Sequence, residues 1–307
     1  MASFQARLIH LILRSGLLGR IDFKSEPAAL RAKMDRMSAK TSAPGSGVRA
    51  ETVNAGGIPA EWLLPENNSG GVLLYLHGGG YVTGSIVTHR ALASRLAKES
   101  GLRTLVIDYR LAPEHPYPAA LDDAAAAYRW LLSSGIAANE ITVAGDSAGG
   151  GLALALLMKL RAEGEELPAG AALLSPWTDL TVSGKSHYTR AKMDPMLTIG
   201  DLLAMGRHYV QDASPADPLI SPLYGDFAGL PPLLIHVGEN EILLDDAARA
   251  ADKAKAAGVE VQYKSWPGVM HVFQAIAPLP EAQAAVSEIA EFLSAKSKSG
   301  AAKKNAA

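Results

Sequence analysis

The chain has 307 residues, of which 48% are hydrophobic and 20% charged, and its net charge at pH 7 is -2. This length supports one or two domains with a substantial core, and the small net charge gives no general attraction to nucleic acid or acidic lipid. Because the chain contains no cysteine, disulfides, zinc–thiolate sites and a thiol nucleophile are excluded, which leaves hydroxyl, amine or carboxylate groups for covalent chemistry.

The first fourteen residues contain leucines and isoleucines at helical spacing. His10 and Arg14 make this apolar run too short and too polar for a signal peptide or a membrane span. The pattern predicts an amphipathic helix that docks on an apolar surface. We therefore expect a cytoplasmic protein without stable membrane insertion.

Short apolar runs alternate with helical patterns from about residue 71 onward. This alternation predicts an α/β fold whose mostly parallel central sheet is covered by helices on both faces. An antiparallel hairpin over residues 48–54 and 58–64 is expected at the start of the sheet. The predicted buried strands are 72–76, 104–107, 141–144, 171–174, 233–237 and 259–263, and the helical stretches include 91–98, 120–132 and 245–257.

Two segments, residues 1–45 and 181–225, carry helical patterns without an intervening strand. We expect them to form one helical cap over a core built from residues 46–180 and 226–295. Such a cap would exclude water from a site at the strand ends and select substrates by shape. The last segment, residues 296–307, contains four lysines and is expected to be a flexible, solvated tail.

The strongest chemical signal is a G-x-S-x-G element centred on Ser147, between a predicted strand and a helical pattern. In a nucleophile elbow a serine sits on a sharp strand-to-helix turn with its hydroxyl exposed, and the flanking glycines let neighbouring backbone approach closely. The alternative is a glycine-rich tight turn with an incidental serine. The position after a strand and before a helix favours Ser147 as a nucleophile.

A second signal, His77-Gly-Gly-Gly80, follows the predicted strand 72–76. Consecutive glycines leave backbone N–H groups free to bind an oxyanion, and the motif matches the oxyanion loop of lipases and esterases. We expect the N–H groups of Gly79, Gly80 and Ala148 to be the donors. His77 itself is expected to hold the loop rather than to act as a base.

The order of residues along the chain selects the general base, because hydrolases with this elbow place their triad as serine, acid and histidine. Four histidines follow Ser147. His187 and His208 lie in the expected cap, and His236 lies in a buried strand, where a hydrogen-bonded structural imidazole is the simpler explanation. His271 follows the last predicted strand in a loop, the position from which a base can reach the serine hydroxyl.

Four carboxylates compete for the role of the triad acid, all in the segment after the strand 233–237. Asp245 and Asp246 are explained as the first turn of the next helix, where a carboxylate complements the helix dipole. Glu239 and Glu241 remain. We favour Glu241, since the acid must orient the imidazole and stabilise its cationic form from this loop.

Four motifs in this order, at residues 77–80, 108–120, 145–150 and 175–180, resemble those of the bacterial hormone-sensitive-lipase-like esterases, and the resemblance covers residues 48–290. It implies an α/β-hydrolase fold with a cap, and serine carboxylesterase activity on short- to medium-chain acyl esters through an acyl-enzyme, without cofactor or metal. It also implies oxyanion donors at Gly79 and Gly80. The family commonly has Asp-Pro-Leu-x-Asp where this chain has Glu241-Ile-Leu-Leu-Asp245, which aligns Glu241 with the acid.

Another enzyme class fits a looser pattern. Gly78, Gly80, Gly84 and Asp108 imitate a dinucleotide-binding unit, and Tyr188 with Lys192 imitates the Tyr-x-x-x-Lys pair of short-chain dehydrogenases. An oxidoreductase would leave the serine elbow and the last histidine unexplained, so the hydrolase interpretation is preferred. Tyr109 and Arg110 are expected to shape the turn after their strand.

A non-catalytic receptor on the same scaffold is a third reading, because plant gibberellin receptors resemble this family and lack the base. The presence of His271 argues against it. The expected partner is a small acyl ester. A homodimer is a further expectation, because a last strand at the sheet edge can pair with its copy.

Overall fold

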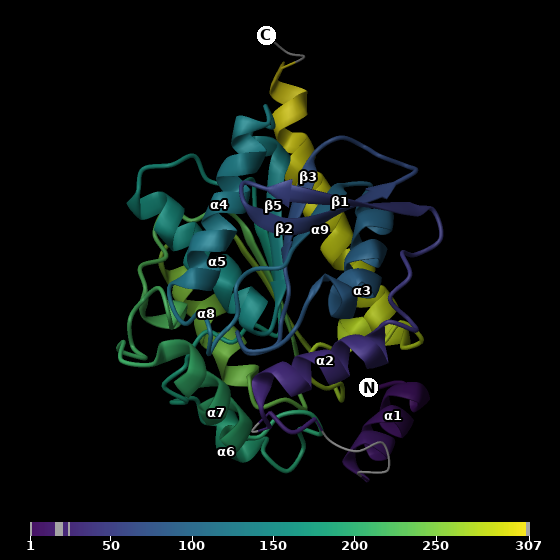
Figure 1. Cartoon of the computed structure of the whole chain (residues 1–307), viewed down its shortest axis with the longest axis vertical. Helices are drawn as coiled ribbons and strands as arrows, with labels where there is room; N and C mark the ends of the chain where they lie inside the picture. Colours follow the sequence, from purple (N-terminus) through teal and green to yellow (C-terminus); the bar gives the residue numbers. More distant parts are fainter. Residues whose placement is uncertain (1, 16–20, 24, 305–307) are drawn as a thin grey trace.

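The computed structural model describes residues 2–15, 21–23 and 25–304. An eight-stranded sheet in the order β1-β2-β4-β3-β5-β6-β7-β8 runs through the molecule (Figure 1). The first two strands form an antiparallel hairpin, β2 is antiparallel to β4, and the remaining neighbours are parallel, which confirms the predicted fold class. The strands are β1 (Val48–Ala55), β2 (Ile58–Pro65), β3 (Val72–Leu76), β4 (Arg103–Ile107), β5 (Ile141–Asp146), β6 (Ala171–Leu174), β7 (Leu233–Gly238) and β8 (Val261–Trp266).

Helices cover both faces of this sheet. The side chains of β3 show why its sequence is a continuous apolar run: Leu74 joins a core with α4 (Ala119–Ser133), α5 (Ala148–Ala162) and α8 (Leu244–Ala256). Its neighbour Leu73 points the other way, into a core with α3 (Ile86–Ser100) and α9 (Pro280–Lys304). A parallel strand buried on both faces needs apolar residues at every position, and all five residues of β3 are buried.

The bounds predicted for the last strand are wrong. The last strand was expected at 259–263 but begins at Val261, because the N–H of Val259 instead bonds the carbonyl of Ala254 at the end of α8. The segment expected to be a flexible tail from residue 296 belongs to α9 as far as Lys304, and its flexibility stays a prediction. Ser297 is buried there, and Lys296 pairs with Glu260. Residues 305–307 lie outside the described residues.

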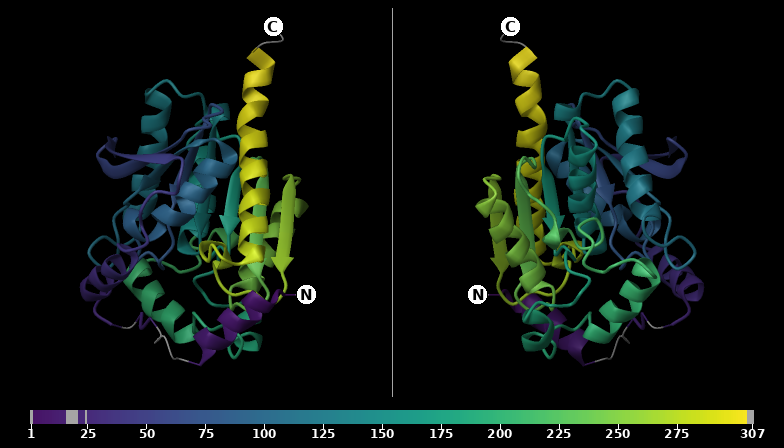
Figure 2. Two further views of the ribbon diagram at one scale, coloured as in Figure 1. Left: turned by 90° about the vertical axis from the view of Figure 1, so that its right-hand side faces the viewer. Right: turned by 90° about the vertical axis from the view of Figure 1, so that its left-hand side faces the viewer.

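Helices from the two expected cap segments gather at the end of the molecule opposite the C-terminus, beyond the carboxyl ends of the parallel strands (Figures 1 and 2). The amphipathic N-terminal helix docks as predicted, since Ala6 packs with Trp266, Val269 and Phe273 in one apolar cluster. In the described ranges no helix is long and apolar enough to cross a membrane. The helices of the two expected cap segments are α1 (Phe4–Arg14), α2 (Pro27–Ser38), α6 (Ser186–Thr189) and α7 (Ile199–Val210). Elsewhere and in the cap segment the chain also forms three short 3-10 helices, which are η1 (Ala138–Glu140), η2 (Pro222–Tyr224) and η3 (Phe273–Ala275).

Candidate active site

Ser147 stands alone between the end of β5 and the start of α5. Its backbone has φ 54° and ψ -121°, a conformation that L residues rarely adopt and that turns its side chain out of the strand. Gly145 and Gly149 allow this turn, because a Cβ on Gly145 would clash with the carbonyl of Gly149, and one on Gly149 with the carbonyl of Leu76. The sequence therefore folds here into the sharp strand-to-helix junction that an exposed serine requires.

The structure brings His271 and Glu241 to this serine. Nε2 of His271 lies 2.9 Å from the Ser147 hydroxyl oxygen, and Nδ1 lies 2.6 Å from a carboxylate oxygen of Glu241. Glu241 is fully buried and His271 nearly so, while Ser147 is partly exposed. Burial lowers the pKa of His271, but the attraction of Glu241 outweighs it and the pKa stands above its ordinary value. The imidazole is therefore ready to accept a proton from the serine.

The glycine loop after β3 packs against the strand end that precedes the serine, where a Cβ on Gly78 would clash with Asp146. Gly79 and Gly80 have φ of 119° and 64°, and a Cβ at either position would clash, with Thr83 and with Met205 of α7 respectively. Ala148 is the first residue of α5, so its N–H belongs to the four that have no acceptor within the helix. This arrangement can stabilise a developing oxyanion.

A buried carboxylate holds that loop in place. Asp146 accepts hydrogen bonds from the Tyr75 hydroxyl at 2.7 Å and the Gly78 N–H at 3.1 Å, and His89 Nε2 lies 3.3 Å from it. Burial alone would raise the pKa of Asp146, but the His89 imidazole keeps it below its ordinary value. The residue before the nucleophile thus fixes the start of the glycine loop.

The chain is similar to known proteins of the alpha/beta hydrolase fold. The model of a protein family with the alpha/beta hydrolase fold matches residues 73–275 of the chain. An esterase structure from the bacterial hormone-sensitive lipase family superposes with a TM-score of 0.90 at 41% identity, covering 96% of this chain and 99% of that one. The chain belongs to the bacterial hormone-sensitive-lipase-like esterases.

Curated relatives agree with this membership. An acetyl-hydrolase of Streptomyces hygroscopicus is 46% identical over 79% of this esterase and 82% of its own length. An esterase of Acinetobacter venetianus is 40% identical over 87% of this chain and 88% of its own length. A hormone-sensitive lipase structure from a metagenome library has a TM-score of 0.92 at 38% identity, with 97% and 100% of the two chains covered.

Glu241 of this esterase is positioned by a residue to which no role was predicted. Ser175, in the fourth motif, donates a hydrogen bond of 2.8 Å to the second carboxylate oxygen of Glu241 and accepts one of 3.2 Å from the N–H of Val272, next to His271. The N–H of Gly238 donates to the same carboxylate oxygen. Only the tertiary fold joins these residues, so the motif alone gave no signal for this contact.

Asp194, from the cap segment, is a second residue that the sequence did not single out. It is buried, and one of its oxygens accepts the N–H of Ile242, directly after Glu241, at 2.9 Å. Burial raises the pKa of Asp194. Its charge in turn helps to raise the pKa of His271, after the larger effect of Glu241. The cap segment therefore contacts the loop that carries the acid.

The competing carboxylates of the esterase point elsewhere. Glu239 accepts a hydrogen bond from Ser265. Asp245 and Asp246 lie in the first turn of α8, as predicted, and both also bind the chain beyond it. Asp245 accepts the N–H of Ser186, and Asp246 those of the residues at 178 and 179. Of the four, Glu241 is the carboxylate that contacts His271.

Three other histidines make structural contacts. His77 stacks on Tyr109 at 4.2 Å between ring centroids, and burial lowers its pKa to about 3, in line with a role in holding the loop. His187 lies 3.1 Å from Asp246. His236 is buried, as expected for a structural imidazole. The prediction that it is hydrogen-bonded is wrong for Nδ1, which has no hydrogen-bond partner among the described residues.

The turn after β4 has the predicted structural role. The Tyr109 hydroxyl donates a hydrogen bond of 2.6 Å to the carbonyl of His77, and Arg110 pairs with Asp123 at 2.6 Å. Asp108 accepts the N–H of Ile86 at the start of α3, which explains its carboxylate without a nucleotide ribose. The described residues hold no group of three or more His, Cys, Asp or Glu that could bind a metal.

Proposed function

We propose that this carboxylesterase hydrolyses short- to medium-chain acyl esters through an acyl-enzyme on Ser147. The observation that carries the proposal is the continuous hydrogen-bonded chain from Ser147 through His271 to Glu241, with separations of 2.9 Å and 2.6 Å. A serine hydroxyl is a weak nucleophile unless a neighbouring base removes its proton, and this geometry supplies the base.

The reaction has two halves. The Ser147 oxygen attacks the ester carbonyl carbon while His271 Nε2 takes the serine proton, and the N–H groups of Gly79, Gly80 and Ala148 bind the resulting oxyanion. The carbonyl then re-forms, the ester C–O bond breaks, and His271 returns the proton to the departing alcohol. Water attacks the acyl-enzyme in the same way, with His271 again as base, and releases the acid and free Ser147.

Glu241 acts by remaining ionised. Its carboxylate accepts the Nδ1–H of His271, which fixes the tautomer whose Nε2 can receive the serine proton, and it stabilises the imidazolium formed during each step. Its other oxygen already has two donors, the Ser175 hydroxyl and the Gly238 N–H. These bonds favour the charged carboxylate over the acid form.

The cap supports the preference for small acyl groups. Met205 of α7 occupies the space that a side chain at Gly80 would fill, and Tyr209 stacks on Tyr81 at 3.8 Å. Both contacts place bulky side chains of the cap next to the oxyanion loop. A helix packed this closely on the loop limits the room for a long acyl chain and keeps water away from the reacting carbonyl.

The test is hydrolysis of chromogenic esters whose acyl chains run from about two to about sixteen carbons. We expect kcat/KM to be highest for the short and medium chains and to fall for the longest. Ser147→Ala should lose hydrolysis of every ester. Full activity in Ser147→Ala would contradict the acyl-enzyme, and a maximum at the longest chains would contradict the substrate range.

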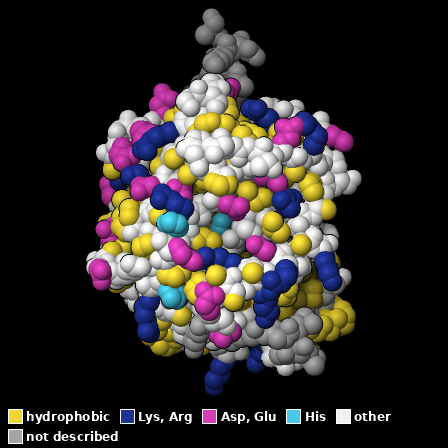
Figure 3. All heavy atoms as spheres, viewed as in Figure 1, with side chains coloured by type: hydrophobic (Ala, Val, Ile, Leu, Met, Phe, Trp, Pro, Cys, Tyr) yellow, Lys and Arg dark blue, Asp and Glu magenta, His cyan; other side chains and the backbone are white. Residues whose placement is uncertain are grey.

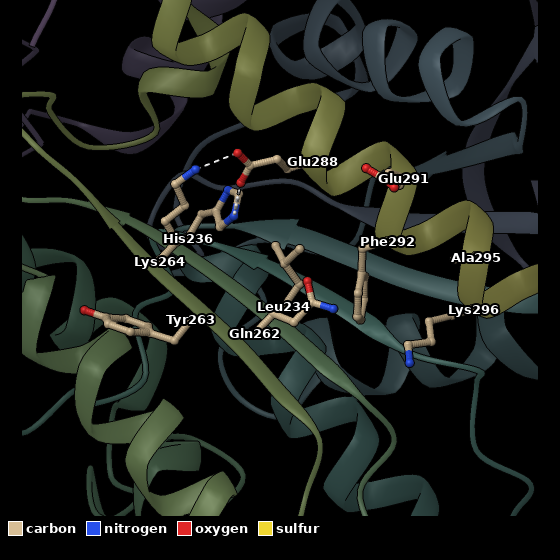
Figure 4. Close-up of a pocket in the computed structure, with 10 residues that line it drawn as sticks. All are labelled: Leu234, His236, Gln262, Tyr263, Lys264, Glu288, Glu291, Phe292, Ala295 and Lys296. Atoms are coloured by element: carbon tan, nitrogen blue, oxygen red, sulfur yellow. Dashed lines mark hydrogen bonds and ion pairs between the residues drawn. The ribbon is translucent and has the colours of Figure 1, made fainter.

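We also infer a homodimer through the sheet edge. In the sheet of the described residues β8 is an outermost strand, and one edge of it is free to pair with a copy. Next to this edge, a groove of about 500 Å³ lies between α9 and the face of β7 and β8 (Figure 4), where Glu288 faces both Lys264 and His236. Light scattering should give twice the 32.1 kDa mass of one chain, and the mass of one chain would refute the dimer. A cytoplasmic location stays a prediction.

A further inference from the structure

The exposed apolar side chains of the protein are concentrated on one part of the structure. Among the described residues, the large hydrophobic side chains that are exposed all lie within residues 1–45 and 181–225. Large exposed apolar patches usually mark a site of interaction. These residues are Phe4, Leu8, Leu11, Met37, Tyr188, Leu203 and Tyr224.

Helix α1 carries three of them on one face. Phe4, Leu8 and Leu11 recur at intervals of four and three residues, so they form a single stripe, and they are 70%, 43% and 65% exposed. The opposite face is already used, because Ala6 is fully buried against the loop that follows β8. Ser3, the N-cap of α1, also bonds Glu281 at the start of α9. The helix is therefore fixed by one face while it presents an apolar stripe to the outside.

Basic side chains surround this stripe. Arg7, three residues after Phe4, and Arg14, three residues after Leu11, are exposed on the same side of α1 as the stripe. Residues 1–45 contain eight Lys and Arg against three Asp and Glu, although the whole chain has a net charge of -2. Figure 3 shows hydrophobic side chains at the lower right, where Figure 1 draws α1, with Lys and Arg beside them. The small net charge of the chain thus conceals a local excess of positive charge.

We propose that this end of the protein docks on anionic lipid surfaces through the outward face of α1, with Phe4, Leu8 and Leu11 inserted among the headgroups. An apolar stripe flanked by arginines is the composition of helices that lie in a membrane interface. The eleven residues of α1 are too few to span a bilayer, so the helix lies on the surface. The charge excess selects an anionic surface over a neutral one.

Docking in this orientation would bring lipid to the active-site end. The cluster that holds Ala6 includes Val269 and Phe273, which flank His271 in the chain, and the cap helices lie at the same end of the molecule (Figure 2). The carboxyl ends of the parallel strands, and with them Ser147, then face the interface. The substrates favoured by docking are esters that partition into an anionic lipid surface.

The experiment is flotation of the full chain with vesicles of phosphatidylcholine alone and with vesicles in which about a third of the lipid is phosphatidylglycerol. We expect binding to the anionic vesicles, loss of that binding at high salt, and little binding to phosphatidylcholine. The double variant Phe4→Ser/Leu11→Ser should bind at least tenfold more weakly. Each basic residue near an anionic surface contributes about fivefold, so Arg7→Gln/Arg14→Gln should bind at least tenfold more weakly as well.

Two controls separate docking from folding and from catalysis. Lys98→Gln/Lys255→Gln removes the same charge from exposed positions at the opposite end, in the last turns of α3 and α8, and should bind like the wild type. Ser147→Ala should also bind normally, so docking is tested independently of the proposed function. Thermal unfolding shows whether each variant is folded.

Three results would overturn the proposal. Wild-type protein that floats with neither vesicle refutes docking. An equal loss of binding in Lys98→Gln/Lys255→Gln refutes the assignment to α1. The third result has two parts: the wild type does not bind vesicles, and Phe4→Ser/Leu11→Ser loses the self-association that the wild type shows. It would mean that the stripe binds a second copy of the chain and not a lipid surface.

Discussion

Replacing Ser175 by alanine tests how the acid of the triad is held. The hydroxyl of Ser175 donates to Glu241 at 2.8 Å and accepts the N–H of Val272 at 3.2 Å, so one side chain links the loops of the acid and the base. A hydrogen bond to a charged group contributes about 1.5 to 3 kcal/mol. The Gly238 N–H still donates to the same carboxylate oxygen, so part of that stabilisation remains in the variant.

From these contacts we expect Ser175→Ala to lower kcat/KM by about tenfold, since about 1.4 kcal/mol of transition-state stabilisation corresponds to a factor of ten. The loss should appear in kcat with KM unchanged, because Ser175 contacts the acid and not the substrate. The assay is steady-state hydrolysis of a chromogenic butyryl ester, together with thermal unfolding of the same preparations.

Ser100→Ala is the matched control. Ser100 is also buried, donates to the carbonyl of Leu96 at 2.6 Å and accepts the N–H of Leu102 at 3.2 Å, but it lies at the far end of α3. It should lose about 1 to 3 kcal/mol of stability without loss of kcat. An unchanged kcat in Ser175→Ala, or an equal loss in both variants, would refute the role of Ser175.

Three further predictions concern the same site. Glu241→Gln should lower kcat by about a factor of 10⁴, as expected when the imidazole loses its orienting anion, and a tenfold loss or less in steady-state kinetics would exclude Glu241 as the acid. Burial lowers the pKa of His271, but Glu241 raises it more, so this pKa stands above its ordinary value of 6.5. Because the neutral base is lost as the pH falls through this pKa, the acid limb of the pH profile of kcat/KM should lie above pH 6.5. An acid limb below pH 6.5 would contradict the pairing of His271 with Glu241. Gly80→Ala should lower kcat by about a hundredfold or more, because the φ of 64° at Gly80 and the neighbouring Met205 side chain exclude a Cβ. The control Gly135→Ala should keep its kcat, because Gly135 also has a positive φ, of 84°, but open space around it. Equal kinetics in the two glycine variants would refute the steric argument.

The local chemistry of the site was predictable because it lies in contiguous residues. The strand-to-helix turn at Ser147 needs glycines on both sides, and residues 145–149 contain them within five adjacent positions. The buried strands were predictable for the same reason, since helices on both faces of the sheet require unbroken apolar runs such as 72–76. Chain order then left His271 as the histidine in a loop after the last strand.

Contacts between distant segments were not predictable. Ser175 and Glu241 are 66 residues apart, and Asp194 reaches the acid loop from the cap segment, so neither contact leaves a local pattern. The start of β8 was misplaced because the bond that Val259 donates to the end of α8 depends on how that helix terminates. The segment 296–304 was expected to be a tail because lysines and serines are typical of solvated chain, although α9 continues as far as Lys304.

Treatment with a fluorophosphonate, followed by peptide mass spectrometry, tests the central claim most directly. A phosphonate reacts with a serine only when a base activates the hydroxyl and donors stabilise the oxyanion, so it reports the assembled site. We expect one adduct per chain, on Ser147, with complete loss of esterase activity and no adduct in His271→Ala. An adduct on another residue, or full activity after Ser147 is modified, would contradict the mechanism.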